Sequence, residues 1–228
     1  MMSAKEAAGR QAAERVEDGM TIGLGTGSTV YFTLVRLAER IRDEGMKLTC
    51  VPTSLDTERK ATEMGIPLAT LDDVGSIDLT IDGADEIDGD FQMIKGGGGA
   101  LLREKVVASM SKAEVIVVGR AKVVERLGTT FKLPVEVVPF ARPVIAREME
   151  RLGAKPFLRL DADERVFLTD NGNEILDCAF ADGIADARAL EAHLARVPGV
   201  VESGLFIDLA SALVIGADDG TCEVREKA

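Results

Sequence analysis

The chain has 228 residues, enough for one large or two small domains with a substantial hydrophobic core. Apolar residues make up 46% of it, which excludes a disordered chain, and no apolar run approaches the roughly 18 residues that span a bilayer. The formal net charge of −12 argues against a nucleic-acid surface, which needs a basic stripe. Three widely spaced cysteines and the lack of a signal-peptide pattern predict a cytoplasmic protein.

The first half of the chain alternates short apolar runs with amphipathic segments. This alternation predicts a parallel sheet with helices on both faces. Strands are predicted at 21–25, 48–51, 77–81 and 115–118, and helices at 4–17, 28–42, 56–64 and 100–110.

The pattern changes after residue 128 to a β-α-β-β-α-β order, which predicts a split β-α-β, ferredoxin-like unit. The segments 212–215 and 222–224 are expected to return to the first sheet. The strands of the second unit are predicted at 135–138, 156–160, 165–169, 174–179 and 200–206, and its helices at 144–152 and 187–197.

A glycine-rich turn lies between the first predicted strand and the second helix. Gly23, Gly25 and Gly27 permit a tight turn, and Ser28 and Thr29 add hydroxyls where the helix begins. Amides and hydroxyls at a helix N-terminus favour a phosphate group. The turn matches neither the dinucleotide fingerprint nor the Walker motif, so a turn that serves only packing is the alternative.

An acidic motif follows the third predicted strand, at the edge where open α/β sheets bind ligands. Asp82 and Asp85 are its central carboxylates, and a solvated acidic turn is the simplest alternative. A metal site is a second alternative, but the calcium-loop spacing fails and the single histidine leaves few transition-metal ligands. We therefore favour hydrogen bonds from these carboxylates to sugar hydroxyls, with no bound metal.

Lys95 comes directly before four glycines and a predicted helix that carries Glu104. A polyglycine run is entropically costly, so it indicates close approach of a ligand to the backbone. The alternative for Glu104 is an exposed carboxylate paired with a neighbouring cation, but the adjacent motifs favour a role in the site. The one histidine, His193, lies far along the chain, so no Ser-His-Asp machinery can form. These residues predict proton transfer on a small phosphorylated molecule.

In their order along the chain, these motifs resemble the A-type ribose-5-phosphate isomerase family. The resemblance rests on GTGST at 25–29, DGADE at 82–86, MIKGGG at 93–98, REK at 103–105, LPVEV at 133–137 and TDNGN at 169–173. It implies a Rossmann-like catalytic domain over residues 1–129 and 204–228. It also implies a ferredoxin-like α+β domain over residues 130–203.

The resemblance implies that Glu104 is the proton acceptor and that Asp82, Asp85 and Lys95 are also catalytic. Lys5 is a further candidate for the phosphate. The substrate contacts that it implies are Thr26, Gly27, Ser28 and Thr29, then Asp82, Gly83, Ala84 and Asp85, then Lys95, Gly96, Gly97 and Gly98, and finally Lys122.

The implied reaction interconverts D-ribose 5-phosphate and D-ribulose 5-phosphate in the non-oxidative pentose phosphate pathway, through a cis-enediol and without a cofactor. The implied assembly is a homodimer or homotetramer, with no nucleic-acid or membrane partner. Two other classes of protein remain as alternatives. A CoA transferase would use a glutamate as a covalent nucleophile, and a non-catalytic sensor would bind a sugar phosphate. Incubation with ribose 5-phosphate alone separates all three.

Overall fold

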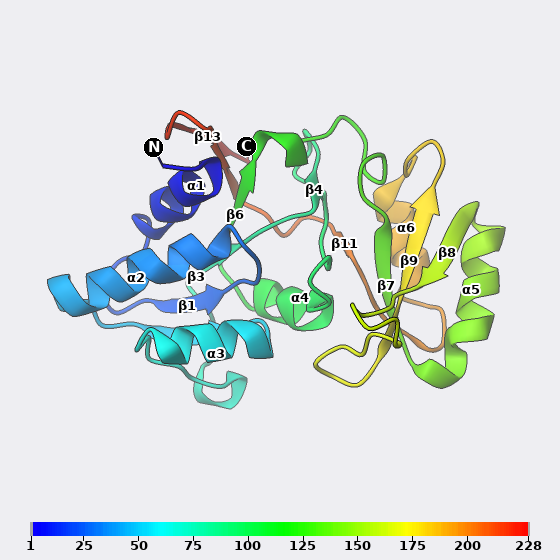
Figure 1. The fold of residues 1–228 in the computed structure, drawn as a ribbon, viewed down its shortest axis with the longest axis horizontal. Helices are drawn as coiled ribbons and strands as arrows, with labels where there is room; N and C mark the ends of the chain where they lie inside the picture. The colour runs from blue at the N-terminus through cyan, green and yellow to red at the C-terminus, as the bar shows by residue number, and fades with distance from the viewer. Residues whose placement is uncertain (1, 228) are drawn as a thin grey trace. The chain divides into compact units, whose positions relative to one another are not determined.

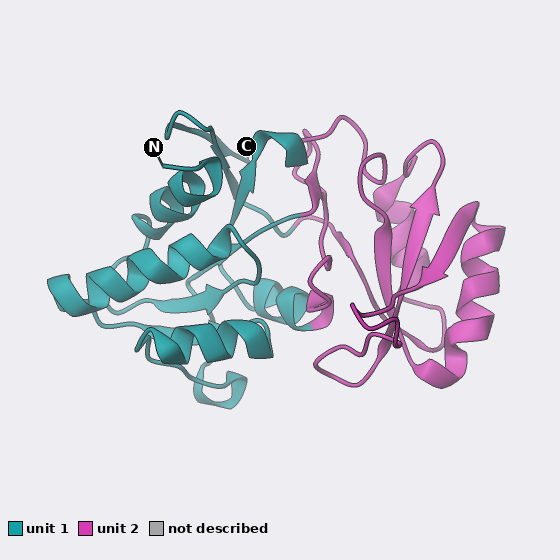
Figure 2. Cartoon of the chain, viewed as in Figure 1, with its two compact units in different colours: residues 1–84, 103–122, 209–228 teal, residues 85–102, 123–208 magenta. Residues whose placement is uncertain are grey.

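The computed structural model describes residues 2–227 and divides into two compact units (Figure 2). Unit 1 comprises Met1–Ala84, Arg103–Lys122 and Leu209–Ala228, and unit 2 comprises Asp85–Leu102 and Val123–Asp208. Residues 85–102 therefore group with the second unit, although the motif order places them in the first domain. The reason is strand pairing, because the short strands of this segment pair with each other and with a strand near residue 205.

Unit 1 is built on a six-stranded sheet in the order β13-β12-β6-β3-β1-β2. All neighbouring strands are parallel except β13, which runs antiparallel to β12 at the edge. The C-terminal segment thus returns to the first sheet, as predicted. The strands are β1 (Thr21–Leu24), β2 (Thr49–Pro52), β3 (Leu79–Asp82), β6 (Glu114–Gly119), β12 (Ala212–Gly216) and β13 (Cys222–Glu226).

The helices of unit 1 cover both faces of this sheet. α1 and α2 lie side by side (Figure 1), and their alanine, valine and leucine side chains share one buried core with strands β1, β3, β6 and β12. On the other face, Val107 of α4 packs with Val51 and Ile77. The helices are α1 (Ala4–Ala13), α2 (Val30–Glu44), α3 (Leu55–Glu63) and α4 (Leu101–Ser109), and the short 3₁₀ turns are η1 (Leu71–Asp73) and η2 (Arg120–Lys122).

Unit 2 contains a four-stranded antiparallel sheet in the order β10-β7-β9-β8. Two helices pack on it through a core that includes Ile145, Met149 and Leu194. This is the β-α-β-β-α-β order predicted from the sequence. The elements are β7 (Leu133–Val137), η3 (Pro139–Ala141), α5 (Arg142–Arg151), β8 (Ala154–Leu158), β9 (Glu174–Phe180), α6 (Ala187–Leu194) and β10 (Val200–Ser203).

A second, three-stranded sheet of unit 2 carries part of the predicted site. Its order is β11-β5-β4, and both pairings are antiparallel. The strands have only two residues each, so no periodicity in the sequence predicts them. They are β4 (Glu86–Ile87), β5 (Met93–Ile94) and β11 (Leu205–Phe206).

Two strand predictions in unit 2 are wrong. Residues 165–169 form no strand, because this segment belongs to a long loop whose β-pairing is limited to one isolated bridge, between Leu160 and Val166. The predicted strand 200–206 is divided into β10 and β11, and these pair in different sheets.

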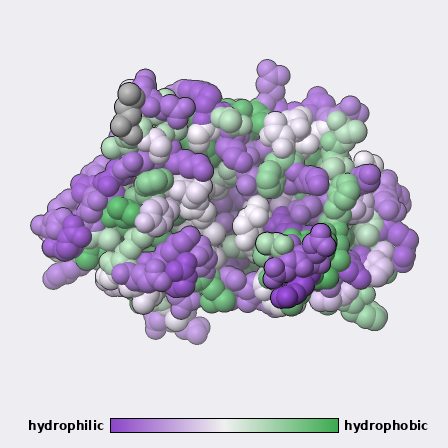
Figure 3. All heavy atoms as spheres, viewed as in Figure 1, coloured by the Kyte–Doolittle hydropathy of each residue, from purple (hydrophilic) through white to green (hydrophobic). Residues whose placement is uncertain are grey.

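The face of the molecule drawn in Figure 3 is mostly hydrophilic, and its hydrophobic side chains gather in small groups. Among the described residues, no helix is both long and apolar enough to cross a membrane.

Candidate active site

A cluster of hydroxyl groups fixes the glycine-rich turn after β1. The Thr26 hydroxyl lies 2.8 Å from the hydroxyls of Thr53 and Ser54 and 3.1 Å from that of Thr57. The Thr57 hydroxyl in turn donates to the Gly25 carbonyl at 2.8 Å. Sequence reasoning missed these three partners because they lie 27 to 31 residues further along the chain, beyond α2 and β2. The signal that it had was the polar run that precedes α3.

Asp82 ends β3 and is fully buried beside this turn. Its Oδ1 accepts the Thr26 N–H at 3.0 Å and the Gly83 N–H at 2.7 Å. A Cβ at Gly25 would lie 2.3 Å from the Asp82 carboxyl carbon, so only glycine allows this approach. The predicted pair of Thr26 and Asp82 is therefore brought together within unit 1.

The start of α2 has the features of an anion site. Gly27 and Ser28 are exposed, and Gly27 has a φ of 121°, which an L side chain rarely adopts. The Lys5 ammonium donates to the Ser28 hydroxyl at 2.9 Å, so a cation from α1 lies at this turn. The N-terminus of the 15-residue helix adds its positive dipole end.

Asp85 begins unit 2 and is held at the polyglycine loop. Its backbone N–H donates to the Ile94 carbonyl at 2.8 Å. Its Oδ2 accepts the Gly97 N–H at 2.7 Å, and a Cβ at Gly97 would lie 2.6 Å from its Oδ1. The glycine is thus required by close approach of the backbone to a carboxylate, while Gly97 and Gly98 remain exposed.

Lys95 follows β5 and is almost fully buried, with 2% of its surface exposed. Its backbone N–H donates to the Gly204 carbonyl at 2.9 Å, and its ammonium lies 5.3 Å from the centre of the Phe206 ring. These contacts to β11 and its neighbour fix the direction of the side chain.

Glu104 lies in the first turn of α4 and is 5% exposed. A carboxylate in this position is stabilised by the N-terminal dipole of its helix. Lys122 ends η2, after β6, and is half-buried. His193 lies on α6 and bonds Glu148 of α5 at 2.7 Å, which is none of the predicted site residues.

The other carboxylates of the acidic motif have structural partners. Glu86 is fully buried and accepts four hydrogen bonds, from the N–H groups of Gly128, Thr130 and Phe131 and from the Thr130 hydroxyl. Asp88 accepts the N–H groups at positions 90 and 92, and burial raises its pKa. Within residues 2–227, no group of three or more His, Cys, Asp or Glu side chains is arranged to hold a metal ion.

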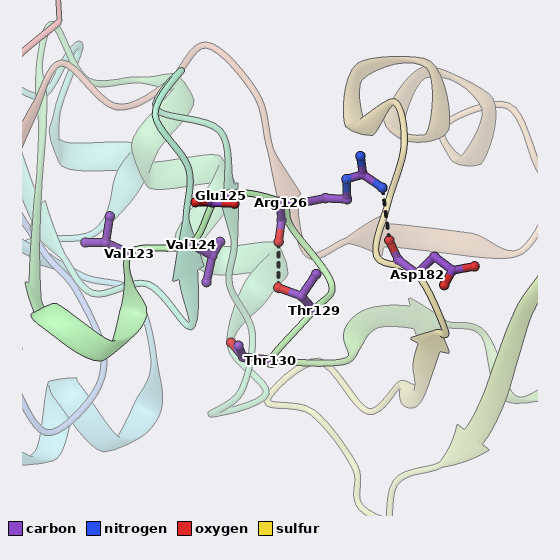
Figure 4. Close-up of a pocket in the computed structure, with 7 residues that line it drawn as sticks. All are labelled: Val123, Val124, Glu125, Arg126, Thr129, Thr130 and Asp182. Carbon is purple, nitrogen blue, oxygen red and sulfur yellow. Dashed lines mark hydrogen bonds between the residues drawn. The ribbon is translucent and has the colours of Figure 1, made fainter.

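A pocket of about 630 Å³ opens in unit 2 (Figure 4). It contains none of the predicted site residues. Arg126 closes one side by donating to the Asp182 carbonyl at 3.2 Å, and Thr129 donates to the Arg126 carbonyl at 2.8 Å. The remaining lining residues are Val123, Val124, Glu125 and Thr130.

Comparison with known proteins places the chain in a family. Residues 49–220 match the model of ribose 5-phosphate isomerase A, also called phosphoriboisomerase A. The chain belongs to the ribose 5-phosphate isomerase A family. It is 48% identical to the enzyme of that name from Bacillus mycoides, over 98% of this chain and 100% of the relative. It is 52% identical to the one from Gloeobacter violaceus, over 96% and 94%.

Solved structures agree with this assignment. The Methanocaldococcus jannaschii ribose 5-phosphate isomerase A matches with a TM-score of 0.93 and 38% identity, over 98% of both chains. The Plasmodium falciparum ribose 5-phosphate isomerase matches with a TM-score of 0.94 and 38% identity, over 100% and 99%. The predicted α/β fold class is confirmed, and so is the prediction of an isomerase.

Proposed function

We propose that this chain interconverts D-ribose 5-phosphate and D-ribulose 5-phosphate through a cis-enediol, as a step of the non-oxidative pentose phosphate pathway. The observation that carries the proposal is a similarity to a D-ribose-5-phosphate isomerase solved in complex with phospho-erythronic acid. That chain is 36% identical, and the match covers 98% of this chain and 97% of that one. Its ligand is a phosphorylated acid whose planar carboxylate resembles an enediolate, the intermediate that this reaction requires.

Glu104 is the proposed base. It takes the proton from C2 of the open-chain aldose and returns it to C1 of the enediol, so the carbon skeleton and the electron count are unchanged. Its support is its burial and its place at the start of α4, where the helix dipole stabilises the carboxylate before the proton is taken.

Asp82, Asp85 and Lys95 are proposed to open the sugar ring and to move protons between O1 and O2. The two carboxylates can accept and return hydroxyl protons, and the Lys95 ammonium can stabilise the charge that develops on the oxygens. Each carboxylate is already oriented by backbone N–H groups, so little reorganisation is needed during the reaction.

The phosphate is proposed to bind at residues 26–29, with Lys5 and Lys122 as the cations. The fixed Thr26 hydroxyl, the exposed turn and the Lys5 contact to Ser28 support this placement. The amides of residues 96–98 are proposed to contact the sugar. The electrons are redistributed within the substrate, so we propose that no cofactor takes part. A cytoplasmic homodimer or homotetramer is the proposed form.

The decisive experiment compares wild type with Glu104→Gln, using ribose 5-phosphate alone in deuterated water. Wild type should form ribulose 5-phosphate and incorporate solvent deuterium at the reacting carbon. The variant keeps the side-chain shape but cannot accept a proton, so kcat should fall by about 10²–10⁴-fold while substrate still binds. An inactive wild type would refute the proposed function. A variant within a few-fold of wild type would move the base to another carboxylate.

A further inference from the structure

Arg159, directly after β8, connects the polyglycine loop to the four-stranded sheet of unit 2. Its Nη1 donates to the carbonyl oxygens of Gly96 at 2.9 Å and Gly97 at 3.2 Å. Its Nε and Nη2 donate to the two carboxylate oxygens of Asp177 in β9, at 2.9 and 2.5 Å. The side chain is only 12% exposed. The guanidinium therefore links two parts of unit 2: Asp177 of the sheet orients it, and it binds the carbonyls of the polyglycine loop.

The peptide group between Gly96 and Gly97 forms a hydrogen bond to a charged side chain through both its carbonyl and its N–H. Its carbonyl accepts from the Arg159 guanidinium, and its N–H donates to the Asp85 carboxylate at 2.7 Å. Hydrogen bonds to charged groups are stronger than neutral ones, and bonds in a chain polarise one another. Arg159 thus strengthens the hydrogen bond that orients Asp85 and stabilises the loop conformation in which this N–H points at the carboxylate.

The loop needs such an anchor because its sequence does not fix its shape. Gly96 and Gly99 have φ values of 100° and 80°, and glycine loses more backbone entropy on ordering than any other residue. The Phe167 ring occupies the space where a Cβ of Gly99 would lie, at 2.5 Å. Phe167 in turn contacts Arg159 in two ways. The Phe167 N–H donates to the Arg159 carbonyl at 3.0 Å, and the Arg159 guanidinium lies 5.8 Å from the centre of the Phe167 ring.

We propose that Arg159 is a positioning residue for the isomerisation, acting through the Gly96–Gly97 peptide on Asp85. The inference rests on the proposed role of Asp85 in the reaction. Lysine cannot replace the arginine, because one ammonium cannot form a paired contact with Asp177 and also reach two loop carbonyls. The backbone of Asp85 is fixed separately by strand pairing, so loss of Arg159 releases the carboxylate rather than the chain.

The test compares steady-state kinetics of Arg159→Ala and Arg159→Lys with wild type. Displacement of a reacting group by about 1 Å costs on the order of 10²-fold, so kcat of the alanine variant should fall about 10- to 100-fold. KM should rise by less than kcat falls, because only the loop amides proposed to contact the sugar loosen, whereas the proposed phosphate contacts at residues 26–29 do not involve Arg159. Methylguanidinium should restore part of kcat in Arg159→Ala, and methylammonium should not. Arg165→Ala, which removes an exposed arginine from the long loop after β8, is the matched control.

Three further results would overturn the proposed role of Arg159. Wild-type activity with an unchanged kcat in Arg159→Ala overturns it and leaves the proposed function intact, whereas an inactive wild type overturns the function itself. A lower melting temperature with normal kcat, or a lost kcat that methylguanidinium does not restore, shows a merely structural role. If Arg159→Ala does not fold, Asp177→Asn keeps the guanidinium but weakens its alignment. Its kcat should fall by at least about three-fold, and an unchanged kcat overturns the inference.

Discussion

Gly25→Ala should be the most informative single substitution outside the ionisable residues. In the structure, an alanine Cβ at this position would lie 2.3 Å from the Asp82 carboxyl carbon and 2.5 Å from its Cα. Carbon atoms in contact are about 3.5 Å apart, so the backbone segments at Gly25 and Asp82 would have to separate by about 1.2 Å. Asp82 cannot move away easily, because it is fully buried and its strand is paired on both sides.

The magnitude follows from that displacement. A shift of about 1 Å at a reacting group costs roughly 10²-fold, so kcat/KM of Gly25→Ala should fall about 10²-fold. Overpacking of a buried site also costs about 1–3 kcal/mol of unfolding free energy. At about 2–4 °C per kcal/mol for a chain of this size, Tm should fall by about 2–12 °C.

The assay measures ketose formation from ribose 5-phosphate, and Tm is followed by far-ultraviolet circular dichroism. Gly119→Ala is the matched control, because Gly119 ends β6 of the same sheet, as Gly25 directly follows β1, and its Cβ would meet nothing within 4 Å. It should stay within about two-fold of wild type. Normal activity and Tm in Gly25→Ala would refute the reasoning. Normal activity with a lowered Tm would show that Asp82 can shift without cost to the reaction, which Asp82→Asn would then test directly.

Three further predictions concern binding, stability and thiols. Alanine at both Ser28 and Thr29 should raise KM more than it lowers kcat, since the proposed phosphate contacts would bind the substrate and the transition state alike; an unchanged KM would move the phosphate elsewhere. Glu86→Gln should cost about 2–4 kcal/mol, because an amide replaces a buried carboxylate that accepts four hydrogen bonds. Urea unfolding measures this, and a loss below about 0.5 kcal/mol would contradict it. Burial raises the pKa of Cys50 to about 12, and Cys178 is also buried. A disulfide reagent should therefore label at most one thiol, Cys222, in the native protein. Labelling of two or three thiols would refute the burial.

Metal independence is expected as well, and exhaustive treatment with EDTA measures it. Activity should be unchanged, because the carboxylates of the acidic motif already have N–H partners. Loss of activity that only a divalent cation restores would refute the assignment of Asp82 and Asp85 to the sugar.

The parts of the fold that could be predicted are those that local sequence determines. Alternating strands and helices with glycine ends predicted the sheet of unit 1, and the glycine turn and the acidic motif fell at strand ends because these positions recur in such sheets. The long loop after β8 could not be predicted in this way. Its segment 165–169 has three consecutive apolar residues between Arg165 and Thr169, yet Val166 and Leu168 are 39% and 57% exposed. Strand propensity yields a strand only where a partner strand and a core are available.

The contacts that hold the candidate site residues could not be predicted from the sequence. Arg159 meets loop carbonyls 62 and 63 residues earlier in the chain, and nothing beside it in the sequence indicates that contact. The hydroxyls that fix Thr26 lie 27 to 31 residues later, between the end of β2 and the first turn of α3. Such contacts arise from tertiary packing, so the sequence indicates the reactive groups more clearly than the groups that orient them.

An acidic protein that binds a phosphorylated sugar must overcome its own net charge of −12 with local groups. At physiological ionic strength the Debye length is about 8 Å, so most of that surface charge is screened at any one point. The glycine turn has a cation well within that length, because the Lys5 ammonium lies 2.9 Å from the Ser28 hydroxyl. The helix N-terminus and the exposed turn amides add donors at the same place. We therefore expect these local donors to determine where the phosphate binds, and the net charge to act mainly on how fast it arrives.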